Sequence, residues 1–134
     1  MGVQLTKDSI DLGIVVRDID KALAFYRDLL GFQAVGDGPM PGGMHMHRLM
    51  CGTSLIKLVS FETAPEARNP PGGINKASGY RYWTMSVSNL EELAAACEGA
   101  GAKIRIPPTE IRPGVRIAMV EDPDGNWVEF LQNG

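Results

Sequence analysis

The sequence predicts an α+β fold in which two tandem βαβββ modules form a cup-shaped mixed sheet with their helices on the outer face. Strand-like and helix-like segments follow one another in the same order in both halves, and matching residues keep a nearly constant spacing. Neither half contains enough helix to cover its sheet, so the halves are expected to pair. We expect one domain over residues 1–134, built from module 1 (9–62) and module 2 (80–132), which a Pro- and Gly-rich linker joins.

The first half carries the pattern of one module. Residues 10–16 combine β-branched side chains with partial alternation, which predicts a strand. Asp18 is a suitable N-cap for the helix that follows, and Gly31 is a suitable residue to end it. Residues 36–43 contain four glycines and two prolines, so we expect a loop there and a lid over 36–46. The other predicted strands of this module are 32–35, 44–50 and 54–61.

The second half repeats this pattern. Residues 80–87 form its first predicted strand. Asn89 is expected to cap the helix that follows, and Gly99 or Gly101 to end it. The sequence Asp-Pro-Asp-Gly at 122–125 predicts a turn. The other predicted strands of this module are 103–106, 115–120 and 127–131.

The two halves can be aligned directly. Residues 16–23 match residues 87–94 at an offset of 71, and residues 55–58 match residues 127–130 at an offset of 72. A nearly constant offset over two separate elements is difficult to obtain by chance, so we interpret the chain as a duplicated unit. The cup between the paired modules is the natural place for a ligand.

Composition excludes several classes of partner. The formal net charge is −3 and no run of Lys or Arg occurs, so the chain lacks the positive face that nucleic acids or anionic membranes attract. No apolar segment approaches the roughly 20 residues that span a bilayer, and no signal-peptide pattern is present. We therefore expect a cytoplasmic protein whose ligand is a small molecule. Cys51 and Cys97 have no CxxC spacing and are expected to be reduced.

Three segments carry a resemblance to a known family. Residues 12–18 and 24–32 of the first module, with the closing segment 121–130, resemble the vicinal oxygen chelate superfamily. This superfamily includes glyoxalase I, bleomycin-binding proteins and extradiol dioxygenases. The resemblance covers nearly the whole chain and implies the fold, but the superfamily hosts many reactions, so fold alone does not settle function.

The resemblance also implies where a site would lie. In metal-binding members, four ligands come from equivalent strand positions of the two modules. In this chain those positions are Asp11, Lys57, Tyr82 and Glu129. A protonated lysine has no lone pair and a neutral tyrosine is a poor ligand, so we expect no metal and no other cofactor here. Lys57 is expected to serve instead as an internal cation between the carboxylates of Asp11 and Glu129.

Each of these positions has a plainer interpretation. Lys57 and Glu129 can form a structural salt bridge that fills an inactive site. Tyr82 can be a core aromatic residue whose hydroxyl is satisfied. Asp11 can bind neighbouring backbone or face solvent.

The histidines form a separate candidate. His45 and His47 lie two residues apart on a predicted strand, so both point to one face. If that face looks into the cup, they form an alternative metal centre with Glu129. If it looks outward, the cup receives Met46 and Arg48 instead. The candidate substrate-binding residues are His47, Arg48, Arg116 and Trp127.

Three functions are compatible with these residues. The favoured one is a metal-independent isomerase or lyase, in which Asp11 or Glu129 removes a proton next to a carbonyl. Lys57 would stabilise the resulting enolate, and Tyr82 would donate a hydrogen bond. The second is a protein that binds a drug or metabolite without chemistry, and the third is a metal-dependent glyoxalase or dioxygenase. The resemblance also implies a homodimer.

Overall fold

The chain divides into two units, Met1–Glu66 and Ala67–Gly134. The computed structural model describes all residues, 1–134. The predicted modules 9–62 and 80–132 each lie within one unit. That the two modules together make a single domain stays a prediction. None of the helices is long and apolar enough to cross a membrane.

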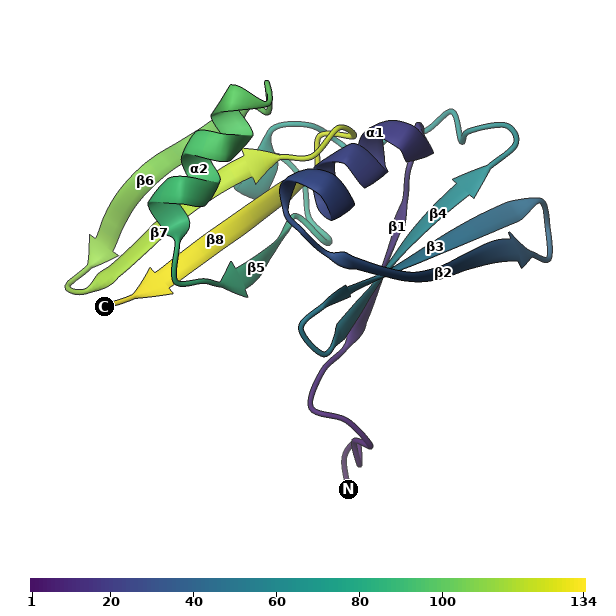
Figure 1. Cartoon of the computed structure of the whole chain (residues 1–134), viewed down its shortest axis with the longest axis horizontal. Helices are drawn as coiled ribbons and strands as arrows, with labels where there is room; N and C mark the ends of the chain where they lie inside the picture. Colours follow the sequence, from purple (N-terminus) through teal and green to yellow (C-terminus); the bar gives the residue numbers. More distant parts are fainter. The chain divides into compact units, whose positions relative to one another are not determined.

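The first unit is one mixed sheet with a helix on one face (Figure 1). Its strand order is β1-β4-β3-β2, where β1 runs parallel to β4 and the other neighbours are antiparallel. This is the predicted βαβββ arrangement. The elements are β1 (Asp11–Val15), α1 (Ile19–Leu23), the π-helical turn η1 (Ala24–Leu29), β2 (Gln33–Met40), β3 (Met44–Cys51) and β4 (Ser54–Phe61).

The second unit has the same topology. Its strand order is β5-β8-β7-β6, again with one parallel pair, β5 and β8. The two sheets therefore confirm the predicted α+β fold and the duplication. The elements are the 3₁₀ turn η2 (Gly73–Asn75), β5 (Tyr82–Ser86), α2 (Leu90–Gly99), β6 (Ile104–Arg112), β7 (Val115–Glu121) and β8 (Trp127–Asn133).

The first helix begins and ends where the sequence predicts. The Asp18 carboxylate accepts hydrogen bonds from the backbone N–H groups of Asp20 and Lys21. This side-chain cap satisfies donors that the first helical turn leaves unpaired. Gly31 follows η1 with a φ of +80°, a left-handed conformation that glycine adopts without strain.

The second helix is capped by a residue that sequence reasoning missed. Asn89 occupies the N-cap position, but its side chain makes no capping hydrogen bond. The Oε1 atom of Gln132, on β8, accepts from the backbone N–H of Leu90 at 2.9 Å instead. The helix ends at Gly99, and Gly101 takes the left-handed conformation with a φ of +85°. A strand side chain thus ties α2 to the sheet.

The prediction of a loop over residues 36–43 is wrong. Strand β2 continues through this segment to Met40 and pairs with β3, which leaves only residues 41–43 as a turn. Residues 36–46 are therefore a hydrogen-bonded hairpin and not a free lid. Strand β6 likewise extends beyond its prediction, through Pro107 and Pro108. Both are edge strands, where proline and glycine are tolerated because one side of the strand makes no ladder bonds.

Alternation along the central strands separates a core face from an open face in each unit. In the first unit, Ile56 and Leu58 on β4 are fully buried, as is Tyr26 of η1. In the second unit, Val128 and Phe130 on β8 are buried in the same way, and α2 lies over this sheet (Figure 1). Residues between these positions point to the other face of each sheet. Those faces carry Asp11 and Lys57 in the first unit, and Tyr82 and Glu129 in the second.

Candidate functional site

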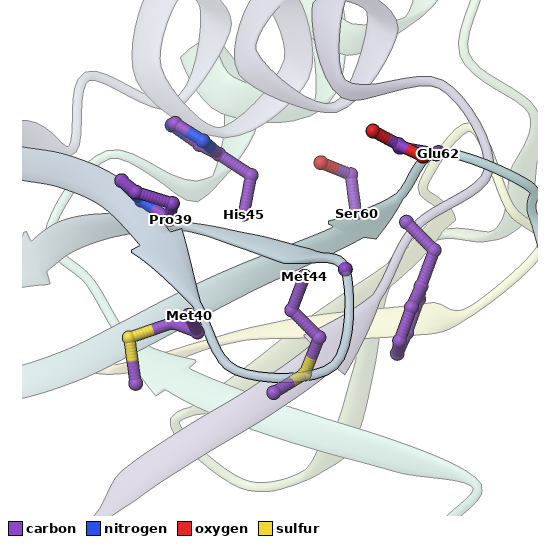
Figure 2. A pocket seen from close by; sticks show the side chains of 8 residues that line it. Pro39, Met40, Met44, His45, Ser60 and Glu62 are labelled. Carbon is purple, nitrogen blue, oxygen red and sulfur yellow. The ribbon is translucent and has the colours of Figure 1, made fainter.

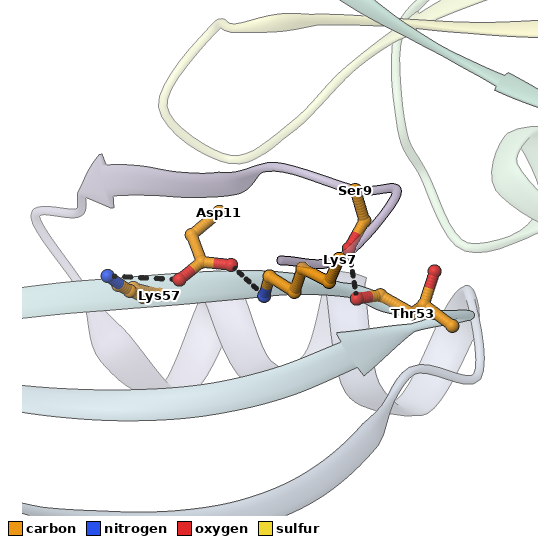
Figure 3. A network of polar contacts seen from close by, with 5 residues as sticks. All are labelled: Lys7, Ser9, Asp11, Thr53 and Lys57. Atoms are coloured by element: carbon orange, nitrogen blue, oxygen red, sulfur yellow. Dashed lines mark hydrogen bonds and ion pairs between the residues drawn. The ribbon is translucent and has the colours of Figure 1, made fainter. Parts of the chain in front are cut away.

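Asp11 is held between two lysine ammonium groups on the open face of the first sheet (Figure 3). Its Oδ1 atom lies 2.6 Å from Nζ of Lys7, and its Oδ2 atom lies 3.5 Å from Nζ of Lys57. About a third of each of the Asp11 and Lys57 side chains is exposed, at 33% and 35%. The hydrogen bond from Lys7, together with the positive charges of Lys7 and Lys57, lowers the pKa of Asp11 below its ordinary value of 3.8. Asp11 is therefore a fixed anion.

The segment before β1 is anchored to the sheet beside this pair. The Ser9 hydroxyl donates to the backbone carbonyl of Thr53, in the turn before β4, at 2.8 Å (Figure 3). This bond joins the segment before β1, the strand of Asp11, to the turn before β4, the strand of Lys57.

The face around Lys57 is open and polar. Lys57 pairs in register with Gly13 on β1 and with Arg48 on β3. Cross-strand partners point to the same face, so Arg48 lies on the Lys57 side of the sheet. A Cβ atom at Gly13 would meet nothing within 4 Å, so no side chain covers the sheet at the position paired with Lys57.

The equivalent face of the second sheet carries Tyr82 and Glu129. Tyr82 is exposed, at 48%, at the start of β5, so it is not the core aromatic residue of the alternative interpretation. Glu129 pairs in register with Thr84, whose hydroxyl donates to Oε1 of the glutamate at 2.6 Å. The carboxylate is therefore oriented by a neutral donor and not by a cation. Sequence reasoning missed Thr84, although its position two residues after Tyr82 places it on the same strand face.

The residues at the family's metal-ligand positions do not fit a divalent cation. Asp11 is compensated by two ammonium groups, and one of them, Lys57, itself occupies a ligand position. A cation that is already present repels a second one, and a protonated lysine donates no lone pair. Tyr82 adds only a phenol. Among the four positions, only Asp11 and Glu129 offer carboxylates, and the Asp11 carboxylate is already paired with two ammonium groups.

The histidines lie on the other face of the first sheet. His47 pairs in register with Leu58, which is fully buried, and His45 pairs with Ser60. His47 therefore does not share a face with Lys57. Met46 and Arg48 lie on the same face as Lys57. Nε2 of His45 lies 2.8 Å from Oδ1 of Asp37, on β2, a residue that sequence reasoning placed in a loop.

Two further candidates have structural partners. Arg116 on β7 forms an ion pair with Glu91 in the first turn of α2, which places it on the helix side of its sheet. Trp127 lies directly beneath Gly73, where a Cβ atom would come within 2.4 Å of the indole ring. Gly73 has a φ of +69°, so only glycine fits this close approach.

Arg81 contacts the linker between the modules. Its guanidinium group donates to the carbonyl oxygens of Gly73 and Pro70, at 2.7 and 2.8 Å, and holds the linker in place.

The turn before β8 is organised by a single buried carboxylate. Asp122 is only 5% exposed, and its Oδ1 atom accepts from the backbone N–H groups of Asp124 and Asn126 at 2.9 and 2.8 Å. Its Oδ2 atom accepts from the Asn126 side chain at 2.9 Å. The predicted turn is confirmed, and the acid at its first position fixes the start of the strand that bears Glu129.

The chain is similar to proteins of one superfamily along nearly its whole length. The model of the Glyoxalase/Bleomycin resistance protein/Dioxygenase superfamily matches residues 9–130. Uncharacterized protein YwkD of Bacillus subtilis is 27% identical over 130 residues, which cover 96% of this chain and 98% of that protein. A lactoylglutathione lyase of Haemophilus influenzae is 24% identical over 123 residues, with 88% and 87% covered. A glyoxalase family protein from Bacillus cereus has a similar structure, with a TM-score of 0.82 at 18% identity over 98% of this chain and 96% of that one.

Proposed function

Because the chain belongs to the Glyoxalase/Bleomycin resistance protein/Dioxygenase superfamily, we propose that it is a metal-independent isomerase or lyase. Its reaction is proton transfer next to the carbonyl group of a small organic substrate. The observation that carries this proposal is the ion pair of Lys57 and Asp11 at positions where metal-binding relatives carry ligands. Similarity to the lactoylglutathione lyase of Haemophilus influenzae supports the choice of a lyase.

Lys57 supplies the positive charge of the reaction. Removal of a proton next to a carbonyl leaves negative charge on the carbonyl oxygen, and a fixed ammonium group stabilises that charge. Asp11 positions the ammonium group through their ion pair. The Lys57 side chain is about a third exposed, so a substrate oxygen can reach Nζ beside Gly13.

Glu129 is the proposed general base. Asp11 is a poor choice for this role, because its pKa is lowered by two ammonium groups and a weak base removes protons slowly. Glu129 accepts a hydrogen bond from the neutral hydroxyl of Thr84 instead, which orients the carboxylate without adding positive charge. Tyr82, exposed on the same strand as Thr84, is the proposed hydrogen-bond donor to the substrate.

Arg48 is the proposed substrate-binding residue of the first unit. It lies directly across from Lys57, on the same face of the sheet. A guanidinium group binds a carboxylate or phosphate through two parallel hydrogen bonds. A substrate with an anionic group near its carbonyl is therefore expected to bind better than its neutral analogue, and we expect R48K to raise KM more than it lowers kcat.

Exchange of substrate protons with heavy water tests the proposal. Small aldehydes and ketones, with and without a carboxylate, are incubated with the protein in D₂O and followed by NMR. K57M is expected to slow the exchange by about 100-fold or more, because it removes the charge that stabilises the enolate. K21M, on the exposed surface of α1, is the matched control and is expected to exchange at the wild-type rate.

Other outcomes point to the competing functions. A K57M variant that folds and exchanges at the full rate contradicts the proposal. Loss of activity with EDTA, restored by Zn²⁺, Ni²⁺, Mn²⁺ or Fe²⁺, points to a metal-dependent glyoxalase or dioxygenase. A compound that binds tightly and is recovered unchanged, without exchange, identifies a binding protein for a drug or metabolite.

We also propose that the protein is a homodimer. The proposal is supported only by membership of the superfamily. Light scattering coupled to gel filtration measures the mass directly, and a dimer doubles the chain mass of 14.5 kDa. A mass of one chain at micromolar concentration contradicts this assignment.

A further inference from the structure

A cluster of three potential metal ligands lies on the β2–β3 hairpin, away from the residues of the proposed reaction. Asp37 pairs in register with His47, and Pro39 pairs with His45, so both histidines and the carboxylate share one face. Nε2 of His45 is 2.8 Å from Oδ1 of Asp37, and the two imidazole rings lie 4.9 Å apart between centroids. One potential ligand atom from each residue lies within 4.8 Å of the other two.

One nitrogen of the cluster is buried without a partner. Nδ1 of His47 has almost no contact with solvent and makes no hydrogen bond. An unpaired buried polar atom destabilises a protein by about 1–3 kcal/mol. The hydrogen-bonding of the cluster is therefore incomplete, and a ligand that supplies an electron-pair acceptor or a proton donor would complete it.

We propose that Asp37, His45 and His47 bind a divalent transition-metal ion such as Zn²⁺. Two imidazoles and one carboxylate are a donor set that suits this class of ion. Ligand atoms about 2.0–2.2 Å from a tetrahedral ion lie roughly 3.4 Å apart. Atoms already within 4.8 Å reach that spacing with side-chain movements of about 1 Å. Water fills the fourth position.

The surroundings of the cluster are compatible with a cation. The His45 and Asp37 side chains are 41% and 55% exposed, so an ion can enter from solvent. His45 also lines an open hollow of about 370 Å³, together with Ser60 and the carboxylate of Glu62 (Figure 2).

This site is separate from the proposed catalytic residues of the first unit. His47 pairs with Leu58 on the helix side of the sheet, whereas Lys57 lies on the open side. An ion bound by the histidines therefore does not replace Lys57 in the reaction. It joins the two strands of the β2–β3 hairpin and is expected to stabilise them.

Titration of the full chain with ZnCl₂ alone, followed by calorimetry, tests the site. We expect saturable binding of one ion per chain. The chain has only two histidines, so a ¹⁵N NMR spectrum of the imidazole nitrogens reports each ligand separately. Both histidines are expected to shift on zinc addition. H45Q and D37N are expected to weaken binding by about tenfold or more, and their exposed positions leave the core intact.

Matched controls separate this site from other donors. D28N removes an exposed carboxylate that pairs with Arg27, and C51S removes the more accessible thiol. Both variants are expected to bind zinc with the wild-type affinity. Wild-type affinity in both H45Q and D37N overturns the proposal, as does the absence of saturable binding below about 1 mM zinc.

The proposed reaction and the proposed metal site can each be refuted without refuting the other. K57M is expected to keep zinc binding and to slow proton exchange, whereas H45Q is expected to weaken zinc binding and to keep the wild-type rate of exchange. If K57M alone abolishes zinc binding, the ion lies at the family's metal position and both proposals are wrong. If K57M exchanges protons normally while H45Q loses zinc, only the proposed reaction is wrong.

Discussion

Replacement of Asp122 by alanine is expected to destabilise the second unit strongly. The carboxylate is 5% exposed and accepts three hydrogen bonds, from the backbone of Asp124 and Asn126 and from the Asn126 side chain. A hydrogen bond to a charged group contributes about 1.5–3 kcal/mol, but the half-buried turn can recover part of that from water. We therefore expect D122A to lower the free energy of unfolding by about 3 kcal/mol.

The same structure predicts a graded series. D122N keeps the Oδ1 acceptor for both backbone groups, but its amide replaces the oxygen that accepts from Asn126, so a loss of about 1 kcal/mol is expected. With an unfolding entropy of about 2.1 cal/mol/K per residue, these losses lower Tm by about 10 °C for D122A and about 3–4 °C for D122N. D8A, which removes an exposed carboxylate, is the control and is expected to stay within about 0.5 kcal/mol of wild type.

Thermal and urea unfolding followed by circular dichroism measure the series. The order wild type, D122N, D122A in decreasing stability is the expected result. A D122A protein as stable as D8A would refute the reasoning, because it would mean that the buried carboxylate contributes nothing that solvent cannot replace. Equal losses in D122N and D122A would show that charge, and not acceptor geometry, stabilises the turn.

The remaining predictions concern titration, reactivity and packing. Carboxyl NMR is expected to place the titration midpoint of Asp11 below 3.8. Its ion pairs therefore stabilise the fold above that pH, and this stabilisation is lost as the pH falls through the lowered pKa. K7A should raise the midpoint, and a wild-type midpoint at or above 3.8 contradicts the geometry. Burial raises the pKa of Cys97 to about 11, so a disulfide reagent at pH 8 should leave this thiol unmodified until the protein is denatured. Cys51, whose pKa is also raised by burial, should react slowly. Rapid modification of both thiols in the folded protein contradicts this prediction. L58A removes a fully buried side chain and is expected to cost about 2–5 kcal/mol in urea unfolding, whereas a loss under 1 kcal/mol would mean that the core refills the cavity.

The fold could be predicted because its signals are local and repeated. Asp18 and Gly31 mark the ends of the first helix, and the turn at Asp122 precedes the last strand. The loop expected over residues 36–43 fails for a physical reason, since glycine and proline interrupt central strands but not edge strands. Which strands lie at an edge is a property of the sheet and cannot be read from a single segment.

The candidate site could be predicted only in part. Alternation places Lys57 between the buried residues Ile56 and Leu58, so its face follows from sequence. Strand β3 shows no alternation of buried and exposed residues, since all but one of its residues are half-buried. The face on which His47 lies therefore depended on the register between β3 and its neighbouring strands, which the sequence does not reveal. No pattern in the sequence marks Lys7 as a partner of Asp11, because the segment before β1 is irregular.

Strand β3 carries two different chemistries in alternate positions, thioether and guanidinium groups on one face and imidazoles on the other. Which residues of β3 point to which face is set by the turns at its two ends, residues 41–43 and the pair Gly52 and Thr53. A one-residue insertion within this strand would exchange the faces beyond it, even though every side chain were retained. The lengths of the two turns therefore decide which side chains of β3 share a face with Lys57. A change in either length would alter the chemistry of both faces without any substitution.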